Sequence, residues 1–292
     1  MQSNVASTTS HPEPDIRRFR RIGNLRSLAY LVADYAVVIG VAVAAERIGG
    51  LWAKALAIIF IAGRQIALTN LLHSASHGSL FTTRRLNDGS DLLLGFPLLE
   101  SVRRYRGSHG DHHRQFSTGD PDRFEYLHGV LQLDRRGFWG RTWIVFIRPL
   151  LGYESVTALR DTLLSLAANP RFAAKTLLYW LVVALVAWRI GYLPQVLFYW
   201  FVPLFTVYPI FYVWAEVSDH FGTPGETRNQ RGLFYALFFK GHEPYHSIHH
   251  EYPFLPFYRL KDVYRVLVAR NATPPAVSGP RSFFASVYAG LG

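Results

Sequence analysis

The chain has 292 residues; half of them are hydrophobic and 15% are aromatic, yet the formal net charge is +11. This combination is typical of a membrane protein with basic loops. Because the cations are scattered among apolar runs rather than gathered on one polar element, the composition argues against nucleic-acid binding. The absence of cysteine excludes disulfides, thiolate zinc sites, iron–sulfur clusters and a cysteine nucleophile.

The first 26 residues are polar and basic. They lack the short basic segment followed directly by an apolar segment that a signal peptide has. We therefore interpret residues 1–26 as a disordered cytoplasmic tail rather than a cleaved signal peptide. Its four arginines are expected either near anionic lipid headgroups or in plain solvent. They are Arg17, Arg18, Arg20 and Arg21.

Four segments are apolar enough to span a bilayer, which needs about 20 residues. They cover about 27–45, 54–72, 176–190 and 195–213. The helix-breaking turns "ERIGGLW" and "GYLPQ" join the first to the second and the third to the fourth, which predicts two helical hairpins. Most basic residues lie outside these spans, so the positive-inside rule places both termini and the middle segment in the cytoplasm, at what we expect is a bacterial inner membrane.

The fold class predicted is therefore all-α integral membrane, with one domain over residues 27–272 and a loose C-terminal tail over 273–292. Residues 90–102 and 143–166 are apolar but too short or too interrupted to span. We expect them to form helices, either lying in the membrane interface or packed in a cytoplasmic cap.

Three polar residues, Asp34, Arg64 and Gln65, fall inside the predicted spans. Polar groups are unfavourable in a bilayer, so such residues usually face the bundle interior or mark a functional site. We expect them to pack in the bundle or to support a metal ligand rather than to take part in catalysis, with snorkelling to the membrane surface as the alternative for Arg64.

Histidines dominate the candidate functional residues. Three clusters contain H-x-x-x-H at His73 and His77, H-x-x-H-H at His109, His112 and His113, and a second H-x-x-H-H at His246, His249 and His250. Residues three or four apart share one face of a helix, so each cluster is expected to aim two or three imidazoles at one point. Imidazole suits iron, zinc, copper and nickel. Eight histidines exceed what one tetrahedral zinc needs, and they suit two metal ions with positions left open for oxygen.

The stretches "GRQIALTNLLHSASHGSLF", "RLND", "YRGSHGDHHRQFSTGDPD", "DHFG" and "YHSIHHEYPFLPFYRL" give the chain its resemblance to a known family. From about residue 63 to 260 it resembles the integral-membrane fatty acid desaturase superfamily, which includes desaturases and hydroxylases. The resemblance implies four spanning helices whose cytoplasmic ends, with a cytoplasmic helical cap, carry the histidine boxes. It also implies a non-haem di-iron centre that activates O₂ and removes hydrogen from an unactivated C–H bond.

The resemblance further implies which residues bind iron. They are His73, His77, His109, His112, His113, His246, His249 and His250, together with His220, which matches an extra histidine after the last span.

Five further residues are weaker candidates. Glu216 and Asp219 could bind metal or orient a ligand, by resemblance. His242 could be a further ligand, a hydrogen-bond partner of a ligand or a plain polar residue. Asp120 and Asp122 could accept hydrogen bonds from ligating histidines, or Asp could cap a turn around Pro121.

The sequence fits a zinc metallohydrolase and a metal carrier less well than an oxygenase of this kind. The stretch "HEPYH" at residues 242–246 also matches the H-E-x-x-H of zinc metallohydrolases, but Pro244 disfavours the continuous helix that this motif needs. A metal carrier would place ligands along a transmembrane path, whereas these gather at one face.

Each turnover of such an oxygenase needs two electrons. Because the chain has no cysteine for an iron–sulfur cluster, we expect an external donor, a ferredoxin-like or other redox protein with its reductase, and the basic surface could dock an acidic one. The substrate expected is apolar, such as a lipid-linked or carrier-linked acyl chain, with a carotenoid or small metabolite as alternatives. The resemblance favours desaturation, and hydroxylation or ketone formation is the alternative outcome.

Overall fold

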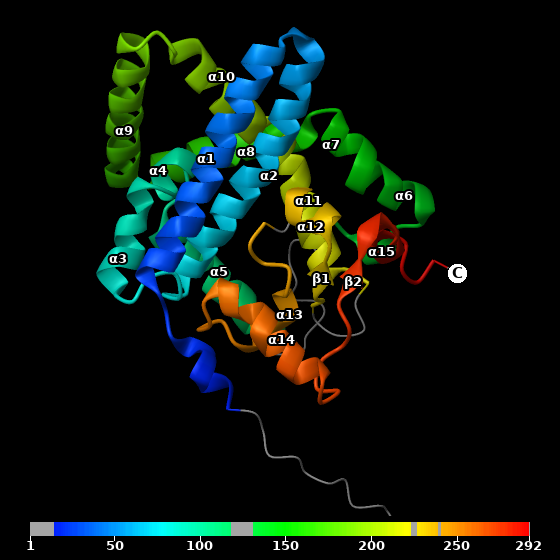
Figure 1. Ribbon diagram of the computed structural model, residues 1–292. Coiled ribbons are helices and arrows are strands. Elements are labelled where there is room, and N and C mark those ends of the chain that lie inside the picture. Colours follow the sequence, from blue (N-terminus) through cyan, green and yellow to red (C-terminus); the bar gives the residue numbers. More distant parts are fainter. Residues whose placement is uncertain (1–14, 118–130, 223–226, 239–240, 292) are drawn as a thin grey trace, which may run out of the picture.

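The computed structural model describes residues 15–117, 131–222, 227–238 and 241–291, with the backbone alone for 114–117, and it is mostly helical (Figure 1). Four helical segments are long and apolar enough to cross a membrane: α1 (Asn24–Ile48), α2 (Gly50–Ser76), α9 (Pro170–Arg189) and the run Leu193–His220. They contain the four spans predicted from the sequence.

The fourth of these segments is divided into α10 (Leu193–Phe205) and α11 (Val207–His220) at Thr206. Pro209 explains the break, because it has no N–H to donate to the carbonyl of Phe205 and its ring crowds that carbonyl. The sequence predicted one continuous span here. The change of direction at Thr206 matters for the site, because α11 ends at His220.

Helix α2 is the central element and packs against α1, α10, α11, α5 (Val102–Ser117) and α12 (Leu233–Phe238). Small residues permit this close packing. At Gly63 a Cβ would lie 2.0 Å from the carbonyl oxygen of Leu237, so only glycine lets the backbone of α12 approach this closely.

Polar groups inside the spans face other elements. Arg64 donates to Asp34 (Nη1 to Oδ1, 3.2 Å) and to the carbonyl of Ala236, while Gln65 donates to the carbonyl of Trp200 at 2.8 Å. These contacts agree with the packing roles expected for the three polar residues, and Arg64 is bound within the bundle rather than snorkelling.

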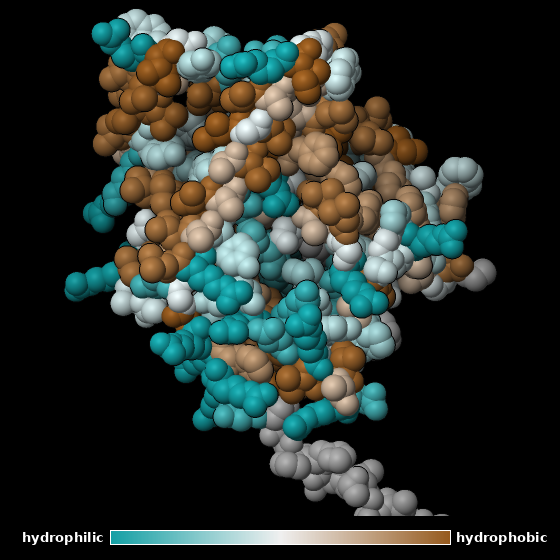
Figure 2. Space-filling view, in the orientation of Figure 1, coloured by the Kyte–Doolittle hydropathy of each residue, from teal (hydrophilic) through white to brown (hydrophobic). Residues whose placement is uncertain are grey.

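The outward faces of the spanning helices are apolar. On α9, Leu177, Leu181 and Trp188 are 71%, 62% and 65% exposed. Figure 2 shows hydrophobic side chains over the half of the molecule that holds α1, α2, α9 and α10, and hydrophilic side chains over the opposite half. A surface of this kind is favourable against lipid and unfavourable in water, so the protein is membrane-associated.

Shorter elements complete the described part of the chain. They are η1 (Ile16–Arg20), α3 (Arg84–Gly89), η2 (Ser90–Leu92), α4 (Gly95–Leu98), η5 (Leu133–Arg135), α6 (Phe138–Thr142), the π-helix η6 (Trp143–Ile147), α7 (Arg148–Leu150), α8 (Tyr153–Ala168), β1 (Gln230–Arg231), α13 (His246–Glu251), η7 (Phe257–Arg259), α14 (Leu260–Val268), β2 (Val277–Ser278) and α15 (Gly279–Val287). The strands pair in parallel, with Gln230 opposite Val277.

The chain ends differ from the sequence-based expectation where they are described. Instead of a disordered tail up to residue 26, η1 buries Ile16 and α1 already begins at Asn24. Instead of a loose tail after residue 272, β2 pairs with β1 and α15 buries Phe283 and Val287 against α11 and α12. Apolar residues at helical spacing in "SFFASV" carry this packing, and their pattern was missed.

Candidate metal centre

Four helices bring the histidines of the clusters to one region. His73 lies in the last turn of α2, with His77 at its C-terminal cap, and His220 ends α11. Helix α5 carries His109, His112 and His113, and α13 begins at His246 and carries His249 and His250.

The side chains form two groups rather than three. The first group contains His73, His77, His109, His113 and His249, and the second contains His112, His220, His246 and His250. In each group the candidate ligand atoms all lie within 4.8 Å of one another. The structure therefore brings together all nine histidines proposed as ligands.

Each histidine box places two imidazoles in one group, as expected, but the remaining histidine of the second and third boxes lies in the other group. His112 belongs to the second group and His113 to the first, while His249 belongs to the first and His250 to the second. Neighbouring residues of a helix are about 100° apart around its axis, since 3.6 residues make one turn, so an H-H pair naturally divides between two centres.

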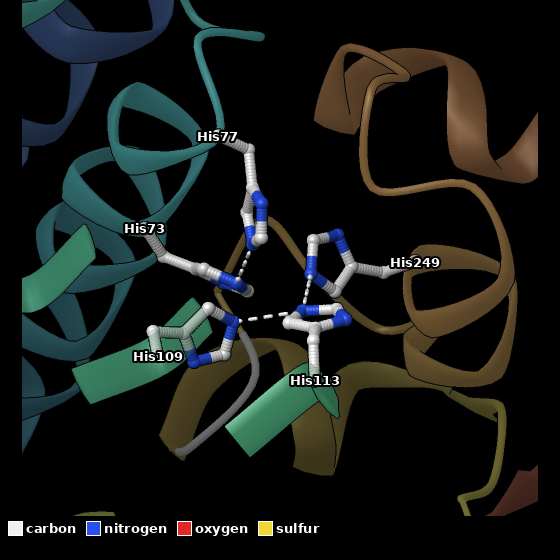
Figure 3. Close-up of side chains that lie close together, drawn as sticks. All are labelled: His73, His77, His109, His113 and His249. Atoms are coloured by element: carbon white, nitrogen blue, oxygen red, sulfur yellow. Dashed lines mark hydrogen bonds between the residues drawn. The ribbon is translucent and has the colours of Figure 1, made fainter. Parts of the chain in front are cut away.

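In the first group the Nε2 atoms converge (Figure 3). His73 and His77 lie 3.2 Å apart at Nε2, and His113 Nε2 lies 2.9 Å from His109 Nε2 and 3.1 Å from His249 Nε2. In the second group His246 Nε2 lies 3.1 Å from the Nε2 atoms of both His220 and His250.

These distances fit ligands of a common ion. Two nitrogens about 2.1 Å from one ion and at right angles to each other are about 3.0 Å apart. The five imidazoles of the first group exceed the four positions of a tetrahedral zinc, so this donor set favours an ion that accepts more ligands, such as iron.

The histidines are held in the neutral form that binds metal. Burial is the main cause: it lowers the pKa of His77 and His112 to about 3 and that of His113 to about 4. Burial and neighbouring histidines lower the pKa of His109 and His249 well below the ordinary value of 6.5. At neutral pH these imidazoles keep a free lone pair.

Glu243 joins the two groups. Its Oε2 lies 2.6 Å from His73 Nδ1 and its Oε1 lies 2.9 Å from His246 Nδ1, and the carboxylate is buried. A carboxylate only accepts, so both histidines donate from Nδ1 and present the Nε2 lone pair to their group. From the sequence, Glu243 is considered only as the base of a zinc hydrolase. Its position one turn before His246 is the feature that indicates a contact with this histidine.

His242 lies outside both groups. Its Nε2 is hydrogen-bonded to Asp34 Oδ2, and Asp34 also accepts from Arg64, so His242 fastens the segment before α13 to α1 and α2. Because α13 begins at His246, His242 and His246 do not share the continuous helix that a zinc-hydrolase motif requires.

The acidic candidates lie at the edge of the second group. Glu216 Oε2 is 4.0 Å from His220 Nε2, and Asp219 Oδ2 is 3.9 Å from His246 Nε2. Both distances exceed that of a hydrogen bond, so each carboxylate lies beside a histidine of the second group without a direct hydrogen bond to that Nε2. Asp120 and Asp122 lie outside the described residues.

A small hollow of about 50 Å³ separates the two groups. Its wall includes His73 and His109 from the first group, His112 and His246 from the second, and the carboxylate of Glu243. The ring of Tyr105 is stacked on His109 and also borders this hollow. The hollow therefore borders histidines of both groups.

The comparisons with known proteins agree with this geometry. The sequence model of the fatty acid desaturase family matches residues 50–277, so the chain belongs to that family and is an oxidoreductase enzyme. A curated relative is the dihydrorhizobitoxine desaturase of Bradyrhizobium elkanii, with 24% identity over 274 residues that cover 84% of this chain and 76% of the relative.

Proposed function

We propose that this protein is a membrane-bound non-haem di-iron enzyme that uses O₂ to desaturate its substrate. The observation that carries the proposal is the pair of histidine groups, five and four imidazoles, joined through Glu243. The first group would hold one iron and the second the other, and the bound irons would supply the activation of O₂ and the abstraction of hydrogen from a C–H bond.

The protein's own residues prepare this chemistry. Glu243 holds a proton on Nδ1 of both His73 and His246, which keeps the Nε2 atoms of these rings available. The hollow between the groups, about 50 Å³, has room for little more than one methylene and one small molecule. A space of this size would hold one C–H bond near the reacting centre.

Desaturation and hydroxylation begin with the same hydrogen abstraction, and an ångström in substrate placement separates their outcomes. The relative named as a dihydrorhizobitoxine desaturase supports desaturation. Hydroxylation or ketone formation is the alternative within the same reaction class.

Metal and product analysis test this function together. Protein purified after iron-replete expression is expected to carry about two irons per chain and to consume O₂ when reduced, as the two histidine groups require. The reaction under ¹⁸O₂ should give an unsaturated product without label. One zinc and no iron would refute the di-iron proposal, and a labelled hydroxyl in the product would establish hydroxylation.

For the topology, we propose two helical hairpins, α1–α2 and α9–α10, with the histidine-bearing elements forming a cap on the cytoplasmic side of a bacterial inner membrane. The excess of basic residues outside the spans supports this orientation. Because the chain has no cysteine, single substitutions can be labelled directly. Arg85→Cys on α3 should be protected from an impermeant thiol reagent in intact cells, whereas Tyr192→Cys in the α9–α10 turn should react; the reverse pattern would refute the orientation.

The two electrons would come from an external ferredoxin-like or other redox protein and its reductase. The net charge of +11 supports docking of an acidic donor. Turnover with an acidic ferredoxin should then fall as ionic strength rises, and turnover that is insensitive to salt would refute this electrostatic docking.

A further inference from the structure

A larger cavity of about 600 Å³ lies next to the histidine groups and is bordered by α5, α8 and α11. Thr69, Tyr105 and Tyr212 line both this cavity and the small hollow between the groups. The volume lies within the range of small-molecule sites, about 300–1,000 Å³. The cavity is therefore placed to hold a substrate whose reacting carbon reaches the hollow.

The walls of this cavity carry charges of both signs. Glu100, Arg104, Arg148, Glu154, Arg160 and Asp161 all line it. A site for a plain acyl chain would be lined mainly by hydrophobic side chains, because desolvating charges against methylene groups is unfavourable. Apolar side chains such as Leu72, Leu98 and Val213 line the rest of the cavity, so the lining favours a ligand that has both a charged part and an aliphatic part.

Helix α8 supports a polar cavity independently, because its amphipathic faces are reversed. Glu154 and Ser165 are buried and line the cavity, whereas Val156 and Leu163 on the outer side of the helix are 69% and 58% exposed. In a soluble protein the apolar face of a helix turns inward. Here apolar residues are exposed on the outer side of the helix, and buried polar residues form part of the cavity wall.

Four of these charges, Glu100, Arg104, Arg160 and Asp161, have no ion-pair partner within 4.0 Å among the described residues, and the two that lie closest to the histidines in the sequence are Glu100 and Arg104. Arg148 and Glu154 pair with each other. Burial raises the pKa of Glu100 to about 7, and the nearby Arg104 opposes this effect. Oε1 of Glu100 is buried and has no hydrogen-bond partner among the described residues, so a cationic ligand group would satisfy it. Arg104 is exposed and would pair with an anionic group of the same ligand.

We propose that this cavity binds a small zwitterionic substrate, with its anionic group at Arg104, its cationic group at Glu100 and its aliphatic part extended towards the hollow. The proposal rests on the proposed function, since it assigns the substrate class of that enzyme. Among the substrates considered from the sequence, it favours a small metabolite with a charged head over an apolar acyl chain.

The reacting carbon lies several bonds from this charged head. Arg104 and His109 are five residues apart on α5, a rise of about 7.5 Å along the helix. The head group and the hollow are thus separated along one rigid element, which fixes which carbon reaches the metal centre.

Binding of matched probes to the purified protein tests the inference without turnover. The probes share a chain of eight carbons. 2-Aminooctanoate carries both charges, octanoate carries only the negative charge and octylamine carries only the positive charge. Palmitate serves as the long-chain probe. Calorimetry in detergent is expected to show tightest binding of 2-aminooctanoate, by about tenfold or more over the singly charged probes, because each paired charge contributes a charge-assisted hydrogen bond.

Charge-removing variants give a pattern that a merely structural role would not produce. Arg104→Gln should weaken 2-aminooctanoate and octanoate about tenfold and leave octylamine unchanged, whereas Glu100→Gln should weaken 2-aminooctanoate and octylamine and leave octanoate unchanged. Arg103→Gln is the matched control, because Arg103 is the neighbour on α5 but reaches Asp88 rather than the cavity.

Tighter binding of palmitate than of 2-aminooctanoate, or binding of 2-aminooctanoate that neither variant changes, would overturn the inference. Iron content is measured on the same samples. Two irons per chain without zwitterion binding would refute the substrate class alone, while zwitterion binding without iron would refute the di-iron function alone.

Discussion

The carboxylate of Glu243 provides a sharp test of how the two histidine groups are organised. It accepts from His73 Nδ1 at 2.6 Å through Oε2 and from His246 Nδ1 at 2.9 Å through Oε1, so each oxygen serves one group. Glu243→Gln keeps the shape of the side chain but replaces one acceptor oxygen with an NH₂ donor. The glutamine can then satisfy only one of the two histidines.

The other histidine faces a donor and must break its hydrogen bond or move its proton to Nε2, the nitrogen that faces its group. Loss of such a supporting partner typically lowers metal affinity about 10- to 100-fold. That range corresponds to about 1.4–2.7 kcal/mol of binding free energy. We therefore expect Glu243→Gln to retain one iron tightly and to hold the other 10- to 100-fold more weakly.

The assay follows iron per chain while the purified protein is dialysed against increasing chelator, with circular dichroism to verify that the helices remain. Glu251→Gln is the matched control, since Glu251 is an exposed carboxylate at the end of α13, the helix that follows Glu243. Glu243→Ala extends the test, because it removes both acceptors and should weaken both irons. If folded Glu243→Gln lost both irons no faster than the control, the bridging role of Glu243 would be refuted.

Three further changes are predicted. His242→Ala should keep two irons, whereas His246→Ala should lose iron from the second group, because only His246 points into a group; equal iron loss from the two variants, measured by metal analysis, would contradict this placement. Gly63→Ala should lower thermal stability by about 1–3 kcal/mol, because its Cβ would lie 2.0 Å from a backbone carbonyl oxygen of α12, and an unchanged melting temperature would show that this contact is not restrictive. Burial raises the pKa of Glu100 from 4.5 to about 7 in the native state, which therefore holds this proton more tightly than the unfolded chain. This protonation stabilises the folded protein fully below pH 4.5, and the stabilisation is lost as the pH rises to about 7. The loss is at most about 3 kcal/mol, and Glu100→Gln should flatten that part of the stability–pH curve followed by thermal unfolding.

Much of the fold could be predicted because its signals are local. Runs of about 20 apolar residues identify spanning helices without reference to any neighbour, and the four runs from the sequence lie within α1, α2, α9 and α10–α11. The break at Thr206 was missed because a proline three residues later acts on a backbone carbonyl, an effect that hydropathy does not register. The burial of α15 was missed for another reason: it depends on contacts with α11 and α12 that are distant in sequence.

The sequence by itself determined that this chain is a helical membrane protein with histidines spaced to bind metal, because hydropathy and helical spacing are properties of short stretches. Only the tertiary structure decided how those histidines divide. An H-H pair presents its two rings about 100° apart, and whether they serve one centre or two depends on which other helices stand beside them. The same packing placed Glu243 between the groups and His242 against Asp34, although the two residues are neighbours in the chain. Their roles differ because the tertiary environment, and not the sequence motif, supplies their partners.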